Sequence, residues 1–224
     1  YDMVVGKNFN VTKDMETSFI NDEDDHNVID PPRQQGGYRG GPFGWSSDSK
    51  ALLLSDGWDV WKVSARGGKG KNLTQDGRAD QIRYGKRFVL EADEKGIDLK
   101  KPIYLSRYGE WTKKGGIVKI NANKVGTKVL EWGDAHFDNL LKAEDTGTYL
   151  YRHESQTNVP EFYKADANLE GDVKITNLGQ QAEVYKLSQD KILVDYVSDH
   201  GVKLQGALYL PANYEPGKKY PTLV

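Results

Sequence analysis

The sequence contains no cysteine. Disulfides, thiolate nucleophiles and cysteine-ligated zinc sites are therefore excluded together. The same absence fits a cytoplasmic protein and equally a periplasmic or secreted protein without structural disulfides. The localisation stays open.

An excess of charge of one sign is also missing. The chain has 31 Lys and Arg against 33 Asp and Glu, a formal net charge of -2. No global field then favours nucleic acid or an anionic membrane. No window approaches the roughly 18 to 20 apolar residues that a membrane span needs, and no charged segment followed by an apolar one opens the chain as a signal peptide does. We expect no nucleic-acid partner and no membrane span in this segment.

Apolar residues at helical spacing are scarce, whereas aromatic residues and glycine are abundant. Aromatic residues make up 11% of the chain, and glycine occurs 24 times. Few stretches keep apolar residues at helical spacing for three turns. At 224 residues the chain can bury a substantial core. Together these features predict an all-β fold.

The first part of the chain, residues 1–41, is expected to be an irregular lead-in. Asn21–Asn27 is an acidic run, and Asp30–Gly41 is rich in proline and glycine. The acidic run lacks the alternating ligands and central glycine of an EF-hand loop, which favours a solvated loop over a calcium site. Because the chain opens on Tyr1 instead of methionine, we expect it to be a piece of a longer protein.

From Phe43 onward, short strands and turns alternate. Trp45–Lys50 predicts a polar turn, Ala51–Ser55 a strand, Asp56-Gly57 a hairpin turn, and Trp58–Val63 a second strand. A third, short strand is expected close to Leu73. With an inner strand added, this unit has the size of one β-propeller blade.

The same pattern returns later in the chain. Ala143–Thr148 takes the place of the first polar turn, and strands are expected at Tyr149–Arg152, Glu161–Ala165 and Lys174–Leu178. A divergent unit lies between them, with strands expected within Gln81–Ala92, Pro102–Ser106, Gly116–Ile120 and Lys128–Trp132. About three blade-like antiparallel sheets over residues 42–185 favour a partial β-propeller. A β-sandwich would also show short strands between turns.

The last part, residues 186–224, breaks this rhythm. Lys191–Ser198 and Val202–Leu210 predict a long hairpin around a turn at Asp199–Gly201. A linker follows, and Pro221–Val224 is typical of the start of a buried strand.

Two stretches of this sequence resemble the prolyl oligopeptidase family of serine peptidases, which includes dipeptidyl and acylaminoacyl peptidases. One is "FGWSSDSKALLLSDGWDVWKVSARGGKGKNLT", and the other runs from "VKITNLGQQ" to "LQGALYLPANYEPGKKYPTLV". The more specific part is Gly206–Val224, which is similar to the phrase that leads from the propeller of that family into its α/β-hydrolase domain. The blade motifs alone are shared with unrelated propellers.

The resemblance implies a two-domain peptidase in which the propeller gates and orients peptides for a Ser-Asp-His hydrolase domain after residue 224. In such enzymes the nucleophile stands in a G-x-S-x-G elbow. No serine of this chain has glycine at both positions two residues away. We therefore expect no catalytic, cofactor-binding or metal-binding residue in this segment, and no activity from it alone. The Glu-Glu pair with which some relatives bind a free amino terminus is absent, so the peptide specificity is undefined.

Two readings from other classes stay open. A non-enzymatic TolB-like propeller that scaffolds a partner protein would show the same blade pattern. The other is a sugar-binding or metal-binding β-domain that uses His136 and the acidic run. A partial propeller would leave exposed sheet edges, through which the segment could self-associate.

Two histidines stand beside carboxylates. Asp134, His136 and Asp138 would share one face of a strand and could bind a metal or transfer protons, but a polar turn between blades is favoured because no fourth ligand is near. His200 follows Asp199 in a predicted hairpin turn, and without a nucleophile elbow we interpret it as a turn residue.

Tryptophans and arginines are the remaining candidates. The tryptophans could form a stacking wall, although core packing between sheets is favoured; they are Trp45, Trp58, Trp61, Trp111 and Trp132. Any arginine could bind a peptide carboxylate, and the sequence does not select among them; they are Arg33, Arg39, Arg66, Arg78, Arg83, Arg87, Arg107 and Arg152.

Overall fold

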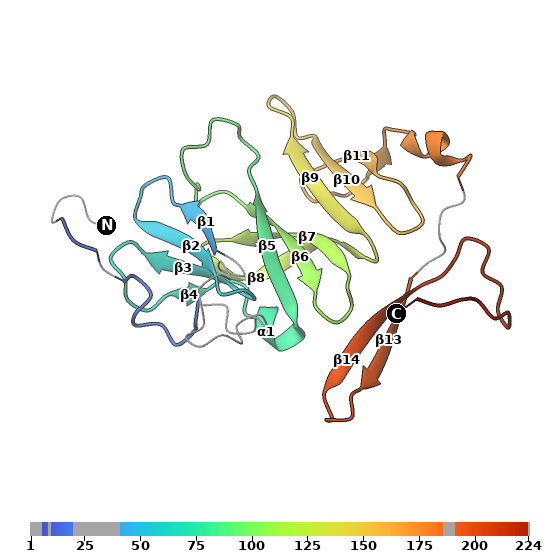
Figure 1. Cartoon of the computed structure of the whole chain (residues 1–224). Helices are drawn as coiled ribbons and strands as arrows, with labels where there is room; N and C mark the ends of the chain where they lie inside the picture. The colour runs from blue at the N-terminus through green and yellow to red at the C-terminus, as the bar shows by residue number, and fades with distance from the viewer. Residues whose placement is uncertain (1–5, 9, 20–40, 186–190, 224) are drawn as a thin grey trace.

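A computed structural model describes residues 6–8, 10–19, 41–185 and 191–223 (Figure 1). It confirms the predicted all-β fold. Three four-stranded antiparallel sheets and one two-stranded hairpin follow one another along the chain. The acidic run, His26, Arg33 and Arg39 lie outside the described residues.

Each four-stranded sheet is a meander in which neighbouring strands in sequence pair in space. The first sheet comprises β1 (Gly41–Trp45), β2 (Ala51–Ser55), β3 (Val60–Ser64) and β4 (Lys71–Asn72). The middle sheet comprises β5 (Ile82–Phe88), β6 (Ile103–Gly109), β7 (Gly115–Asn121) and β8 (Lys124–Gly133). The third sheet comprises β9 (His136–Lys142), β10 (Tyr149–Glu154), β11 (Glu161–Ala165) and β12 (Val173–Lys174). Four-stranded meanders of this kind are the blades of a β-propeller.

The remaining elements are short, apart from one hairpin. Helix α1 (Gly77–Asp80) connects the first sheet to the middle sheet, and the 3-10 helix η1 (Leu178–Ala182) follows the third sheet. Strands β13 (Lys191–Val197) and β14 (Lys203–Tyr209) form the predicted hairpin. Among the described residues, no helix has the length and apolar character required to span a membrane.

The middle sheet is packed on both faces. One face joins the first sheet in a core cluster that contains Leu53, Val60, Leu105 and Val118, all at most 1% exposed. The opposite face meets the third sheet in a second cluster, which includes Tyr104, Ile117 and Tyr149. Alternation along β6 explains the arrangement, because Leu105 points to one neighbouring sheet and Tyr104 to the other.

A buried acidic residue closes the end of the first sheet. Asp59, 5% exposed, accepts hydrogen bonds from the Thr74 hydroxyl (2.6 Å) and from the Gly77 N–H (2.9 Å). The Thr74 hydroxyl oxygen accepts in turn from the Val60 N–H at 3.1 Å. We call this arrangement the acid–threonine clasp.

The third sheet repeats the clasp. Glu161, 6% exposed, accepts from the Thr176 hydroxyl, from the Leu178 N–H (3.1 Å) and from the Gly179 N–H (2.9 Å). The Thr176 hydroxyl oxygen accepts from the Phe162 N–H at 2.9 Å. These hydrogen bonds, led by that of Thr176, lower the pKa of Glu161 below its ordinary value. The predicted equivalence of the first and third units is therefore visible in their hydrogen bonds.

The loop of residues 89–102, between β5 and β6, reaches both neighbouring sheets. The Ile97 N–H donates to the Trp45 carbonyl (2.8 Å), and the Ser47 N–H donates to the Ile97 carbonyl (2.9 Å). On the other side, Glu91 pairs with Lys142, which ends β9, at 3.9 Å. This loop therefore ties the inner strands of all three sheets together.

Some predicted boundaries are wrong, and side-chain hydrogen bonds explain two of them. The turn between β2 and β3 is longer than Asp56-Gly57, because Asp56 Oδ1 accepts from the Trp58 N–H (3.0 Å) and the Asp59 N–H (2.8 Å), and pairing resumes at Val60. The strand expected at Lys174–Leu178 ends at Lys174, since Glu161 takes the following hydroxyl and N–H groups.

The polar turn expected at Asp134–Asp138 is a further correction. Strand β9 begins at His136 and pairs with β10. Its core-facing residues, Phe137 and Leu140, bury themselves against the middle sheet, and this tertiary packing outweighs the polar character of the segment.

The hairpin has two unlike faces. Cross-strand pairs Ile192 with Leu208 and Tyr196 with Leu204 lie on one face, together with Val194. These five side chains are between 38% and 51% exposed, so this apolar hairpin face is uncovered. The opposite face mixes polar residues such as Gln205 with apolar ones such as Leu193, and it is the face turned toward the sheets.

Candidate functional site

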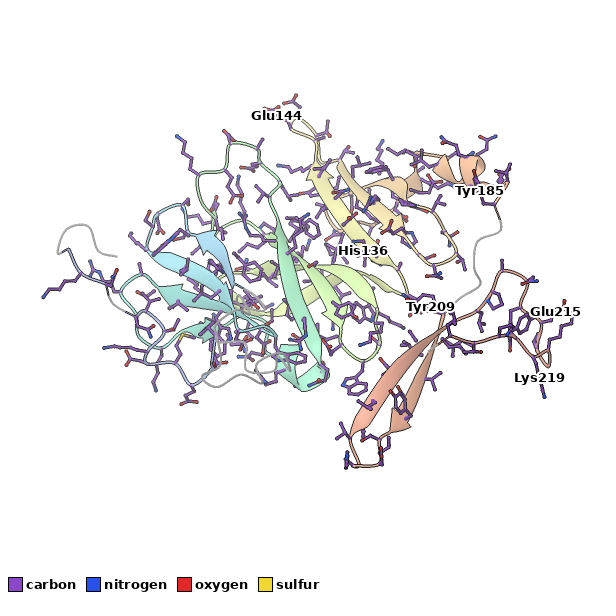
Figure 2. The ribbon with its side chains drawn as sticks, viewed as in Figure 1. His136, Glu144, Tyr185, Tyr209, Glu215 and Lys219 are labelled. Carbon is purple, nitrogen blue, oxygen red and sulfur yellow. The ribbon has the colours of Figure 1, made fainter. Side chains whose placement is uncertain are left out.

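A cleft of about 850 Å³ lies where the third sheet, the middle sheet and the hairpin meet. The third sheet contributes residues at the start of β9 and the end of β10. The middle sheet contributes the turn between β6 and β7, and the hairpin contributes the face opposite its apolar one. Figure 2 shows His136 near the end of β9 that is turned toward the hairpin. The lining residues used below are Lys113, Asp134, His136, Glu154, Lys191 and Gln205.

The third-sheet wall of the cleft is acidic. His136 and Glu154 are cross-strand partners in β9 and β10, and Asp134 precedes β9. Neither Asp134 nor Glu154 forms an ion pair with any residue that the structure describes. Both carboxylates line the cleft, and Glu154 also acts electrostatically on Arg152.

Asp138, which the sequence placed on one strand face with Asp134 and His136, forms an ion pair with Arg152. Its two carboxylate oxygens accept from Arg152 Nε (2.8 Å) and Nη2 (2.7 Å), a bidentate pair. His136 Nε2 approaches Asp138 Oδ2 only to 3.4 Å. Across the described ranges, no three His, Asp or Glu side chains gather in a way that could hold a metal ion.

The other wall carries two lysines without carboxylate partners among the described residues. Lys113, in the β6–β7 turn, donates from Nζ to the Glu110 carbonyl. Lys191 begins β13, and its Nζ lies 5.8 Å from the Tyr209 ring centroid. Acidic and basic groups therefore stand on different structural elements around one cleft.

Gln205 fixes the hairpin wall. Its Nε2 donates to the Trp111 carbonyl (3.0 Å) and to Asp195 Oδ1 (2.8 Å), and the first of these bonds joins the hairpin to the middle sheet. The two acceptors define the orientation of the side-chain amide. Its Oε1 is buried and has no partner among the described residues. A buried acceptor without a donor destabilises the fold by about 1 to 3 kcal/mol. The unpaired Oε1 therefore weakens the contact between the hairpin and the middle sheet.

A second cavity, of about 490 Å³, lies under the loop of residues 89–102. Several of its charged groups form ion pairs with one another. Arg87 pairs with Glu94 at 2.9 Å, and Lys101 pairs with Glu91 at 2.7 Å. The lysines and carboxylates of the first cleft form no ion pair among the described residues, and we therefore take the first cleft as the candidate ligand site.

A row of aromatic rings lies along the third sheet, on strands β9, β10 and β11. Phe137 stacks on His153 with ring centroids 4.9 Å apart, and Tyr151 stacks on Tyr163 at 5.6 Å. The Tyr151 hydroxyl lies 3.2 Å from both Glu131 Oε1 and Asp172 Oδ2. Burial raises the pKa of Glu131 and lowers that of His153. The hydrogen bond from Tyr151 to Glu131 of β8 joins this row to the middle sheet.

The predicted tryptophan packing is partly confirmed. Trp58 is buried, with the Arg83 guanidinium 3.7 Å from its ring centroid, and Trp132 packs against the first core cluster. The prediction is wrong for Trp45 and Trp111, which are 50% and 41% exposed. Among the described residues, no two tryptophan rings stack on each other, so the five tryptophans do not form the alternative stacking wall.

Three of the candidate arginines form ion pairs with carboxylates at short distance. Arg83 pairs with Glu110, Arg87 with Glu94, and Arg152 with Asp138. None of the six arginines that the structure describes lines the cleft. His200 lies in the hairpin turn as predicted, where the Gly201 N–H donates to the Ser198 carbonyl at 2.9 Å.

Sequence reasoning did not single out Glu154, Lys191 and Gln205 as site residues. Glu154 lies on β10, whereas Lys191 and Gln205 lie on the two strands of the hairpin. Glu154 could have been noticed in the sequence, because it follows His153 at the end of a predicted strand. Its pairing with His136 could not have been predicted, because that depends on the register between β9 and β10.

The fold and the cleft together define an all-β protein of propeller-type sheets with a mixed-charge cleft at one end. Compared with models of known protein families and with curated protein sequences, the chain matches none. It is similar in structure to the AtxE2 isopeptidase with Astexin3-dC4 bound, at a TM-score of 0.50 and 10% identity over 80% of this chain. At that identity the likeness concerns the fold alone.

Two further solved structures are similar at lower TM-scores. An oligogalacturonate lyase in complex with manganese gives 0.43 at 11% identity, covering 75% of this chain and 48% of the lyase. A prolyl endopeptidase gives 0.38 at 13% identity, covering 72% of this chain and 29% of the endopeptidase. The chain spans 25% of the length of the isopeptidase that it matches.

Proposed function

We propose that this chain is a non-catalytic propeller segment of a serine peptidase of the prolyl oligopeptidase family. In this proposal it admits and orients peptides for a Ser-Asp-His hydrolase domain located after residue 224. The resemblance of Gly206–Val224 to the propeller–hydrolase junction supports the family. The fold shared with an isopeptidase is consistent with it.

The observation that carries this proposal is the uncovered apolar hairpin face. A two-stranded hairpin is marginally stable by itself in water. On this hairpin Ile192, Val194 and Tyr196 are each about half exposed. Such a face is suited to packing against a further layer of structure, and in the proposed enzyme the hydrolase domain supplies that layer.

The cleft gives the proposed gating a location. It lies between the last propeller-type sheet and the hairpin face opposite the apolar one, so the two strands of the hairpin would stand between a bound peptide and the covering domain. The segment would supply binding and orientation, and the following domain would supply the nucleophile.

Activity measurements test the division of roles. The 224-residue chain is incubated with chromogenic dipeptide and acyl-peptide substrates, and we expect no hydrolysis because no serine stands in a nucleophile elbow. Hydrolysis that a serine-directed phosphonate abolishes would show that the nucleophile lies in this segment, contrary to the proposal.

The coding sequence after codon 224 tests the family. We expect a G-x-S-x-G elbow after a strand within about 250 residues, the upper size of a typical domain. A stop codon soon after residue 224, or another binding domain in place of the elbow, would instead favour a TolB-like scaffold with no peptidase activity.

A further inference from the structure

The charges in the cleft are segregated by structural element. Asp134 and Glu154 both belong to the third-sheet wall, whereas Lys113 and Lys191 come from the middle sheet and the hairpin. A ligand of one charge would meet like charge on one of the two walls. A neutral apolar ligand would strip water from four charged groups without replacing it.

A ligand with opposite charges at its two ends avoids both costs. Its cationic end can lie against Asp134 and Glu154, and its anionic end against Lys113 and Lys191. A short peptide with free termini has this charge distribution, because its α-amino group is protonated and its α-carboxyl group ionised near neutral pH. The cleft, at about 850 Å³, falls within the range of volumes that enclose small ligands.

We propose that this cleft binds short free peptides as zwitterions, with the ammonium group at Glu154 and Asp134 and the carboxylate at Lys191 and Lys113. The inference rests on the proposed function in one respect, namely that the ligand is a peptide. It adds that both ends are recognised, so long chains and peptides blocked at their termini are excluded or bound weakly.

Four forms of one peptide test the charge requirement. A peptide of four alanines is titrated into the 224-residue chain by calorimetry with free ends, N-acetylated, C-amidated, and blocked at both ends. The free form should bind most tightly. Each block removes one exposed charge pair, which is worth a factor of about 3 to 5 in affinity, and the doubly blocked form should bind weakest.

Matched substitutions assign each end to its wall. Glu154→Gln should weaken the free and C-amidated peptides and leave the N-acetylated peptide unchanged. Lys191→Gln should weaken the free and N-acetylated peptides and leave the C-amidated peptide unchanged. Glu144→Gln and Lys219→Gln serve as controls, because Figure 2 places both residues far from His136. Thermal unfolding of every variant confirms that it folds.

The outcomes separate this inference from the proposed function. Equal affinity for all four peptides, or substitutions that change every peptide alike, would overturn zwitterion recognition and leave peptide binding in place. If none of the four peptides binds, zwitterion recognition fails and so does the proposed peptide-orienting role. The family assignment would still be decided by the coding sequence.

Discussion

Asp59 and Glu161 occupy equivalent positions in two different sheets, and each accepts hydrogen bonds from a threonine hydroxyl and a glycine N–H. The two clasps have the same spacing in sequence from acid to threonine and from threonine to glycine, in spite of the change from aspartate to glutamate. The extra methylene of Glu161 is accommodated because the carboxylate also reaches the Leu178 N–H.

The two clasp glycines should differ in their tolerance of a methyl group. A Cβ at Gly77 would lie 2.7 Å from Asp59 Oδ1 and 2.8 Å from the Trp58 carbonyl carbon, whereas a Cβ at Gly179 would have no neighbour closer than 3.5 Å. Gly77→Ala should therefore lower the free energy of unfolding by about 1 to 3 kcal/mol. Gly179→Ala is the matched control and should change it by less than about 0.5 kcal/mol. Urea unfolding measures both, and equal effects would contradict the geometry.

His153 should make stability depend on pH. Burial lowers its pKa in the folded state, so the folded chain resists protonation that the unfolded chain accepts. Its contribution is fully present above the ordinary histidine pKa and is lost as the pH falls through the lower folded pKa. We expect His153→Phe to reduce the loss of stability between about pH 7 and pH 5.

Thermal unfolding at several pH values measures this effect. His200→Gln, in the exposed hairpin turn, is the control and should leave the pH dependence of wild type intact. A His153→Phe profile that is parallel to wild type would show that this histidine does not contribute.

Ile97 should be essential to the contact between the loop of residues 89–102 and the first sheet. Its side chain is 2% exposed and lies in the first core cluster. Ile97→Ala should lower the free energy of unfolding by about 2 to 5 kcal/mol through lost burial and the cavity left behind. Ile192→Ala, on the uncovered hairpin face at 47% exposure, makes the same chemical change and should cost far less. Chemical denaturation followed by tryptophan fluorescence compares the two.

The apolar hairpin face should make the separate chain associate with itself. Val194 and Tyr196 are neighbours on that face and are 45% and 51% exposed. Val194→Lys should therefore reduce concentration-dependent association, measured by light scattering, without changing the unfolding temperature appreciably. Lys203→Glu, at the hairpin turn, is the control, because it alters charge and leaves the apolar hairpin face intact. Val60→Lys cannot serve as a control, because Val60 is fully buried. Association unaffected by Val194→Lys would point to another surface.

The sequence allowed most strands to be predicted where alternation is bounded by turn residues, as at Ala51–Ser55 and Glu161–Ala165. It did not allow β1 and β9 to be predicted. Strand β1 contains Pro42 and two glycines, and β9 mixes polar residues such as His136 and Asp138 with apolar ones, so both owe their strand structure to packing and pairing with neighbours. The cleft could not be predicted for a related reason, since it depends on how three distant elements meet.

The loop of residues 89–102 also bears on the order in which the chain folds. Within each sheet the strands pair with their neighbours in sequence, so these contacts close short loops and can form early. The bonds from Ile97 to Trp45 and from Glu91 to Lys142 instead join separate sheets over much longer stretches of chain. We expect these bonds to form after the sheets themselves, so that Ile97→Ala accelerates unfolding more than it slows folding.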